Sequence, residues 1–407
     1  MRILALSHDL PSPYFSDTLP VFHFLRNLSQ VHGHQITLVT FYSERGSKAD
    51  LQMLAQFCTI GGIFPIKRTI SMHQKTLEFI SNTVIHNLLT RFESGITAAD
   101  FYFSSSMAHR VEDLLQEEND LVYLTWPMGD YVRHASAPKV LQLFDALDEW
   151  NAQVSKSHRG VQKYVDLATS LLFEKFERGI TEFNVSLIPT QRDKTLVGRW
   201  SPSADIRVVP LGVDTESFKP GDFLDQRPSL IFVSDMSGAP TVTNVIFFYT
   251  KVYPIICRAI PEVRLYLVGR NPAPEIARLS LDPSVVVTGY VESVKPYLAR
   301  AHVFVAPMIT GTGMKNKVLE AMAMGKSIVS TAEGARGLDV VPGEHLLLAD
   351  DPMAFAQCVI ALLKDEGKRR FLGANARALV ERKYSWEVVT GLMNMIIEET
   401  AGNRRTA

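Results

Sequence analysis

The segment "RILALSHDLPSPYFSDTLPVFHFLRNLSQVHGHQITLVTFY", residues 2–42, contains the pattern that decides the fold class. A short apolar run (2–7) is followed by a loop with two prolines, then by apolar residues at helical spacing (19–30), then by a second apolar run (34–42). Short apolar runs on either side of an amphipathic helix are typical of two buried parallel strands and their crossover helix. The segment therefore predicts a βαβ unit of a parallel sheet.

The alternation of strand-like and helical segments continues along the chain and then starts again. Helical stretches are expected over 72–118, 150–183 and 243–257, and the segment 218–228, rich in Pro, Gly and charge, is the best linker. Further strand-like runs stand at 120–126, 139–145, 185–190, 206–214, 229–235, 263–270, 285–290, 302–308 and 327–331. Two such series predict two Rossmann-like α/β domains in tandem.

The expected domains are 1–205 and 206–384, followed by a C-terminal helical segment, 385–407. Its apolar stripe suits a helix that packs back on the first domain. The chain has 407 residues, which is more than one average domain needs.

Composition excludes several classes of protein. Hydrophobic residues make up 46% and charged residues 21% of the chain, and the formal net charge is −1, which argues against a broad nucleic-acid-binding surface. The three cysteines lie far apart, so neither a disulfide framework nor a zinc site is expected, and a reducing compartment suits them. No apolar run approaches the roughly 18 residues of a membrane span. We expect a cytoplasmic protein, and contact with the inner face of the membrane stays open.

The stretch "GTGMKNKVLEAMAMGKSIVST", residues 311–331, combines two glycines, two lysines and a carboxylate. Gly311 and Gly313 allow a tight turn close to a ligand, and the following helix directs its N–H groups and its positive dipole end at that loop. Lys315 and Lys317 add charge that suits a diphosphate, and Glu320 suits ribose hydroxyls. The alternative is a surface ion pair on a helix that a glycine terminates.

The stretch "GTGMKNKVLEAMAMGKSIVSTAEGARGL" resembles the donor-site segment of retaining GT-B glycosyltransferases of family 4, the glycosyl transferases group 1. "VVPLGVDTESFKP" is similar to their interdomain element, and "VVVTGYVESVKPYLARAHVFVAPM" to the segment that recognises the base. "FDALDEW" is similar to the middle of bacterial exopolysaccharide-associated sugar transferases. The resemblance implies a GT-B fold, in which two Rossmann-like domains face each other across a cleft.

The resemblance also implies roles for residues of the second domain. Glu320 matches the glutamate that binds the donor ribose, and Thr312 replaces the glutamate that touches the transferred sugar. Lys315 and Lys317 match a basic pair that neutralises the leaving diphosphate. The other donor-site positions are Ser234, where Gly is typical, the base-pairing segment Gly289, Tyr290 and Val291, and the loop Gly311, Gly313 and Met314.

The acceptor side is less well marked in the sequence. Ser16 and Asp17 replace the glycines of the family's first loop, and Asp17 as a simple helix cap is an equal alternative. Trp126 suits either stacking on a sugar or packing in the core. Asp145 follows a predicted strand at the edge where ligands bind, so it suits contact with the acceptor hydroxyl or capping of the next helix.

The resemblance implies a glycosyltransferase that moves a sugar from a UDP- or GDP-sugar to an acceptor hydroxyl with retention of configuration. The catalytic residues are then Lys315, Lys317 and Asp145, and no metal or other cofactor is required. The expected partners are the nucleotide sugar and a glycan, lipid-linked or small-molecule acceptor in polysaccharide or glycoconjugate synthesis, and no nucleic acid. A nucleotide-sugar 2-epimerase-like enzyme and a non-catalytic sugar-nucleotide binder are the alternatives. The sugar, the linkage and the oligomeric state are left undetermined.

Overall fold

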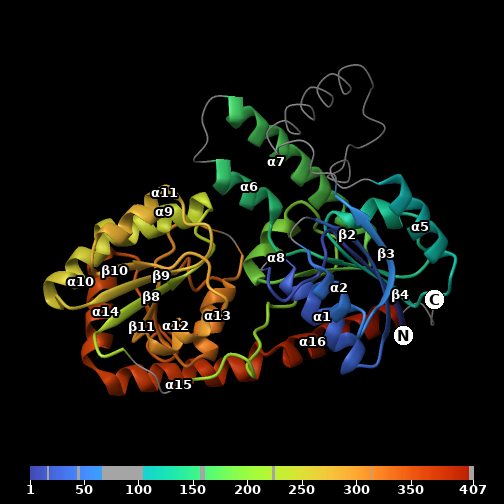
Figure 1. Cartoon of the computed structure of the whole chain (residues 1–407). Coiled ribbons are helices and arrows are strands. Elements are labelled where there is room, and N and C mark those ends of the chain that lie inside the picture. The colour runs from blue at the N-terminus through green and yellow to red at the C-terminus, as the bar shows by residue number, and fades with distance from the viewer. Residues whose placement is uncertain are drawn as a thin grey trace. The chain divides into compact units, whose positions relative to one another are not determined.

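The computed structural model describes residues 1–15, 18–43, 46–66, 104–155, 161–221, 225–311 and 313–402. These residues divide into two compact units, Met1–Val209 with Thr390–Ala407, and Pro210–Val389. Each unit contains one parallel β-sheet with helices packed against it (Figure 1). The prediction of two Rossmann-like α/β domains is confirmed.

The first unit contains a seven-stranded sheet with the order β3-β2-β1-β4-β5-β6-β7, and every adjacent pair of strands is parallel. Its strands are β1 (Arg2–Ser7), β2 (Gln35–Tyr42), β3 (Thr59–Pro65), β4 (Leu121–Thr125), β5 (Lys139–Gln142), β6 (Val185–Ile188) and β7 (Ile206–Val208). Its helical segments are α1 (Leu19–Gln30), α2 (Lys48–Leu54), α5 (Ser105–Leu115), η1 (Met128–Val132), α6 (Leu147–Ser155), α7 (Val161–Gly179), η2 (Ile180–Glu182) and α8 (Gln191–Gly198).

The second unit contains a six-stranded parallel sheet with the order β10-β9-β8-β11-β12-β13. Its strands are β8 (Ser229–Val233), β9 (Arg264–Val268), β10 (Val285–Val287), β11 (Val303–Ala306), β12 (Ser327–Ser330) and β13 (Leu347–Leu348). Its helical segments are α9 (Ala239–Phe247), η3 (Phe248–Val252), α10 (Tyr253–Ala259), α11 (Pro274–Ala277), η4 (Arg278–Leu281), α12 (Lys295–Arg300), α13 (Asn316–Ala323), α14 (Pro352–Lys364) and α15 (Glu366–Lys383).

Helices cover both faces of the sheet in the second unit. Helix α14 packs on α10, and α13 packs on α15 on the opposite face (Figure 1). Strands β8, β11 and β12 are buried along their whole length, as expected for a parallel sheet covered on both sides. This burial explains why their sequences are continuous apolar runs rather than alternating ones.

The C-terminal helix α16 (Trp386–Gly402) supplies the last described residues of the first unit. The Asn27 side-chain amide donates to the Thr390 hydroxyl over 3.4 Å, and His34 Nε2 lies 2.6 Å from Asn394 Oδ1. The Arg207 guanidinium donates to the Glu399 carboxylate over 3.0 Å. Residues from α16 thus contact α1, β7 and the turn before β2.

The structure corrects several details of the sequence interpretation. Strand β3 was missed because Gly61 and Gly62 interrupt its apolar pattern, and α2 and β13 were missed because they are short. The stretch 150–183 contains two helices, α6 and α7, rather than one. Of the stretch 72–118, residues 72–103 lie outside the described residues, and α5 confirms the remainder.

The helix expected over 243–257 contains a π-helical turn, η3, between α9 and α10. Within η3 the Tyr253 N–H donates to the Phe248 carbonyl, five residues back. Pro254 follows directly and has no N–H, so it cannot continue a regular α-helical ladder. The proline therefore explains why one amphipathic stretch forms two helices.

Candidate active site

Doubly wound sheets bind ligands at the carboxyl ends of the strands, where the strand order reverses. In the second unit this point lies between β8 and β11. Asn244 of α9 connects the loops that follow these strands: its Nδ2 donates to the Thr310 carbonyl over 3.1 Å, and its Oδ1 accepts from the Ile309 N–H over 2.8 Å. The segment leading to the glycine loop is therefore held at a fixed distance from α9.

The glycine loop has a backbone conformation that glycine favours. Gly311 has φ of +140° and Gly313 has φ of +64°, a region that residues with a Cβ rarely adopt. A Cβ on Gly311 would lie 3.2 Å from Lys315 Nζ. Thr312, between the two glycines, lies outside the described residues, and Met314 is buried. Gly311 thus leaves room for the Lys315 side chain to fold back over the loop.

Helix α13 begins directly after this loop, with Lys315 at the N-cap position. The Lys315 side chain makes no capping hydrogen bond to the start of α13, and the buried Asn316 Oδ1 has no hydrogen-bond partner among the described residues. The unpaired N–H groups of a first turn carry partial positive charge and favour an anion. The arrangement suits a phosphate group at this end of α13.

Glu320 and Lys317 lie on one side of α13. The Lys317 ammonium donates to Glu320 Oε1 over 2.7 Å, and the Glu320 side chain is 8% exposed. The second oxygen, Oε2, is buried and has no hydrogen-bond partner among the residues described. A buried carboxylate oxygen is costly unless it accepts a hydrogen bond. Glu320 can therefore accept from a ligand hydroxyl, as its predicted contact with a ribose requires.

Two further carboxylates pair with the other basic groups at this edge. Lys315 Nζ donates to the Gly313 carbonyl over 3.1 Å and lies 3.9 Å from Glu333 Oε1, while Glu333 also pairs with Arg336. After β8, Asp235 pairs with Arg270 at 2.8 Å. Burial acts to raise the pKa of the Asp235 carboxyl, but hydrogen bonds from Ser237 and Arg270 lower it overall. Each of the described cations named here thus has a carboxylate partner.

The remaining predicted donor-site residues stand at the same edge. The Ser234 hydroxyl lies 3.1 Å from the Thr241 hydroxyl of α9, and a Cβ on Gly269 would lie 1.7 Å from the Ser234 carbonyl oxygen. Gly269 therefore allows the loops after β8 and β9 to touch. Beyond β10, Gly289 has φ of +67°, Tyr290 is 77% exposed, and Val291 is half-buried.

In the first unit, the described acceptor-side residues Trp126 and Asp145 follow β4 and β5 at the carboxyl edge of the sheet. Ser16 and Asp17 lie outside the described residues, and the N-cap of α1 is Thr18. Trp126, after β4, packs edge to face against Phe173 and Phe176, with ring centroids 5.6 and 5.8 Å away. The structure thus shows Trp126 in an aromatic cluster next to the core.

Asp145 is half-buried, three residues beyond the end of β5 and two before α6. The start of α6 is capped by Glu177 from α7, whose Oε1 accepts from the Leu147 N–H over 2.7 Å. Burial raises the pKa of Glu177 to about 7, an effect that its hydrogen bonds with Leu147 and Asp148 oppose. Glu177 therefore holds the segment that carries Asp145.

Sequence reasoning missed Glu177, Asn244, Glu333 and Arg336. Glu333 and Arg336 were within the donor-site segment "TAEGARGL", but no spacing rule linked them to the glycine loop. Glu177 and Asn244 had no signal at all, because a polar residue in a helix is ordinarily exposed. After β1, the His8 backbone N–H donates to the Thr125 hydroxyl over 3.1 Å, and its Nδ1 lies 3.0 Å from the same hydroxyl.

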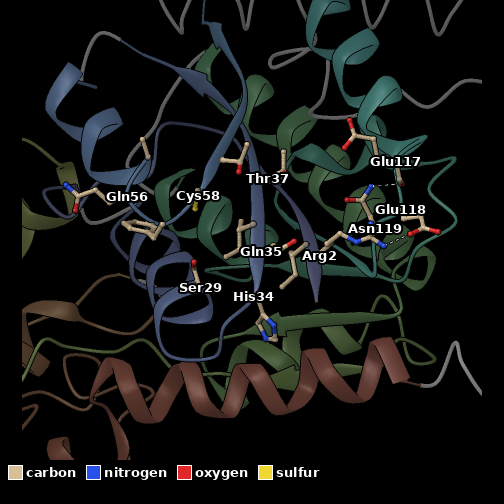
Figure 2. A pocket seen from close by; sticks show the side chains of 15 residues that line it. Arg2, Ser29, His34, Gln35, Thr37, Gln56, Cys58, Glu117, Glu118 and Asn119 are labelled. Atoms are coloured by element: carbon tan, nitrogen blue, oxygen red, sulfur yellow. Dashed lines mark hydrogen bonds and ion pairs between the residues drawn. The ribbon is translucent and has the colours of Figure 1, made fainter.

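A cavity of about 630 Å³ lies at the opposite, amino edge of the first sheet (Figure 2). Its wall includes Arg2, His34, Cys58 and Glu118, and Arg2 pairs with Glu118 at 2.6 Å. Burial raises the pKa of the Cys58 thiol to about 12. None of the predicted site residues lines this cavity.

Within the ranges given above, no group of three or more His, Cys, Asp or Glu side chains is arranged to hold a metal ion. In that same part of the chain, no helix has the length and apolar character needed to cross a membrane.

Residues 227–365 match the family model Glycosyl transferases group 1. An uncharacterized 44.6 kDa protein in the cps region of Klebsiella pneumoniae is 24% identical over 94% of this chain and 96% of its own. A phosphatidyl-myo-inositol mannosyltransferase of Mycobacterium leprae is 25% identical over 67% and 75% of the two chains.

Among solved structures, Anabaena HepE in complex with UDP and glucose has a TM-score of 0.64 at 16% identity, and covers 98% of this chain and 100% of its own. The fold is that of GT-B glycosyltransferases, and the chain is a glycosyltransferase. Its segment 227–365 matches the glycosyl transferases group 1.

Proposed function

We propose that the protein is a retaining family 4 enzyme that transfers a sugar from a nucleotide-diphosphate sugar to an acceptor hydroxyl. The observation that carries the proposal is the edge formed by the glycine loop, the uncapped start of α13 in the described chain, and the buried Glu320. These groups supply donors for phosphate and an acceptor for ribose hydroxyls. A nucleotide sugar contains both chemical groups on one molecule.

In the proposed mechanism the acceptor hydroxyl attacks the anomeric carbon on the face that the diphosphate leaves. The bond from the sugar to the diphosphate oxygen breaks as the bond to the acceptor oxygen forms, and the diphosphate oxygen takes the acceptor proton. Lys315, Lys317 and the first turn of α13 stabilise the negative charge that develops on the diphosphate. Positioning and electrostatic stabilisation then account for the catalysis, with no metal step.

We assign donor binding to the second unit and acceptor binding to the first. Asp145, held by the Glu177 cap of α6, is the proposed contact for the acceptor hydroxyl. UDP- and GDP-sugars are the proposed donors, and the UDP bound to HepE supports the first of them. The Klebsiella relative in a cps region supports a role in surface polysaccharide synthesis, with a glycan, lipid-linked or small acceptor on the cytoplasmic side.

The test is a panel of UDP- and GDP-sugars, first by thermal stabilisation and then by release of nucleoside diphosphate with and without acceptor. A donor at about 100 times its dissociation constant adds about 2.7 kcal/mol to the free energy of unfolding, which a melting experiment detects readily. One base should stabilise the protein and the other should not. If no member of the panel binds, the proposed donor site is wrong.

Release of diphosphate without transfer would favour hydrolysis, and simple isomer exchange would favour the epimerase alternative. Retention is tested by nuclear magnetic resonance of the first product formed, since the coupling constant of the anomeric proton distinguishes the two configurations. An inverted product would refute the same-face mechanism and leave the donor site intact.

A further inference from the structure

The turn after β12, residues 331–337, is held against the segment that follows β11. The Thr331 hydroxyl donates to the Met308 carbonyl over 2.6 Å, and a Cβ on Gly334 would lie 2.6 Å from the Ala306 carbonyl oxygen. Such a close approach admits only glycine at position 334. The turn therefore places Glu333 and Arg336 next to the glycine loop, although α13 and β12 separate them from that loop in the sequence.

Arg336 contacts the glycine loop directly. Its Nη1 donates to the Gly311 carbonyl over 3.2 Å, and its Nη2 pairs with Glu333. A guanidinium has about five N–H donors in a planar fork, which matches two phosphate oxygens at once. Arg336 therefore retains donor capacity at the loop where the diphosphate is proposed to bind.

Glu333 is shared between two cations. One oxygen pairs with Arg336 and the other lies 3.9 Å from Lys315 Nζ. The side chains of Lys315, Glu333 and Arg336 are 15%, 16% and 17% exposed, so their charges are only partly screened by water. The three groups together carry one net positive charge.

We infer that Arg336 is a further ligand of the donor diphosphate and that the Glu333 carboxylate lowers the affinity of the site for the diphosphate. This inference rests on the proposed function. A nucleoside diphosphate product carries one more negative charge than the nucleotide sugar, because its terminal phosphate is free. A cation cluster without a compensating carboxylate would therefore bind the product more tightly than the substrate. Glu333 lowers that excess and favours product release.

The structure also explains why this chain uses Arg336. The loop after β8, residues 234–240, contains no Arg or Lys. Arg270, at the same edge, is paired with Asp235. Arg336 approaches the loop from β12, on the opposite side of β11 from β8, and supplies a cation from another strand.

The test measures the affinity of UDP by isothermal titration and the affinity of uridine by competition with UDP. If the panel of nucleotide sugars shows that the protein prefers guanine, GDP and guanosine replace UDP and uridine. Arg336→Gln should weaken UDP binding at least tenfold and change uridine binding less than twofold. Glu333→Gln, which keeps the shape and loses the charge, should tighten UDP binding at least threefold. Arg258→Gln is the control, because it removes the same charge far from the proposed site. Arg258 is exposed and lies at the end of α10, which leads to the amino edge of the sheet.

Equal losses for UDP and uridine in Arg336→Gln, or weaker UDP binding in Glu333→Gln, would overturn the inference. If Arg336→Gln does not fold, Glu333→Gln and Arg336→Lys decide, since Arg336→Lys keeps the charge and should lose less than tenfold. A parent protein that binds neither UDP nor GDP would instead refute the proposed function. Failure of the inference can thus be told apart from failure of the proposed function. It requires a parent protein that binds UDP or GDP, together with variants that do not show the expected changes in affinity.

Discussion

Replacement of Glu320 by Gln tests the ribose contact. The Glu320 side chain is 8% exposed and one of its oxygens is held by Lys317, so the other is the acceptor left for the ligand. Gln keeps the shape of the side chain and loses its charge, which weakens a charge-assisted hydrogen bond. A hydrogen bond to a charged group contributes roughly 1–3 kcal/mol, so the ribonucleotide donor should bind about 5- to 150-fold more weakly.

The assay compares a ribonucleotide donor with its 2′-deoxy analogue in the parent and in Glu320→Gln. The deoxy donor lacks one of the hydroxyls, so the variant and the parent should differ for it by less than about threefold, as a double-mutant cycle requires. Glu262→Gln, at an exposed position before β9, is the matched control and should change neither affinity. Equal losses for both donors would show that Glu320 stabilises α13 or orders Lys317 and does not hold the ribose.

Three further outcomes follow from the site. Ala at both Lys315 and Lys317 should lower turnover at least about a hundredfold and weaken nucleoside diphosphate binding, because electrostatic stabilisation of the leaving group is lost; unchanged turnover removes them from the mechanism. Activity should survive EDTA within about twofold; its loss, restored by Mg²⁺ or Mn²⁺, would defeat the account of the lysines. Glu177 has a raised pKa of about 7 in the folded protein, so the folded state binds more protons than the unfolded state and stability falls as pH rises toward 7. Glu177→Gln should therefore gain melting temperature relative to the parent between pH 5 and pH 8, and no relative gain would contradict the buried cap.

The interpretation of the glycine stretch shows what can be predicted from neighbouring residues. Gly311 and Gly313 have the positive φ values that were expected of a tight loop, and Lys317 and Glu320 share a side of α13. These features follow from local spacing and from the conformational freedom of glycine. The pairing of Glu333 with Lys315 and Arg336 was not predictable in this way, because it depends on how the turn after β12 meets the end of β11.

Trp126 and Asp145 show the same difference in the first unit. Their positions after β4 and β5 were predicted from apolar runs. The sequence supports the two interpretations of Trp126 equally, and its contacts with Phe173 and Phe176 depend on how α7 packs against the residue after β4. The cap that Glu177 places on α6 spans thirty residues of sequence, and no local pattern predicts a hydrogen bond of that range.

Apolar periodicity and glycine placement act within one turn or one strand, so the order of residues predicts the alternation of strands and helices, the two Rossmann-like units and the loop that precedes α13. The missed strand β3 marks the limit of that information, because Gly61 and Gly62 carry no side chains to show a buried face. Only the tertiary structure decided which side chains share a site. Arg336 reaches the glycine loop, and Glu177 reaches α6, because strand order and helix packing join segments that no local rule connects.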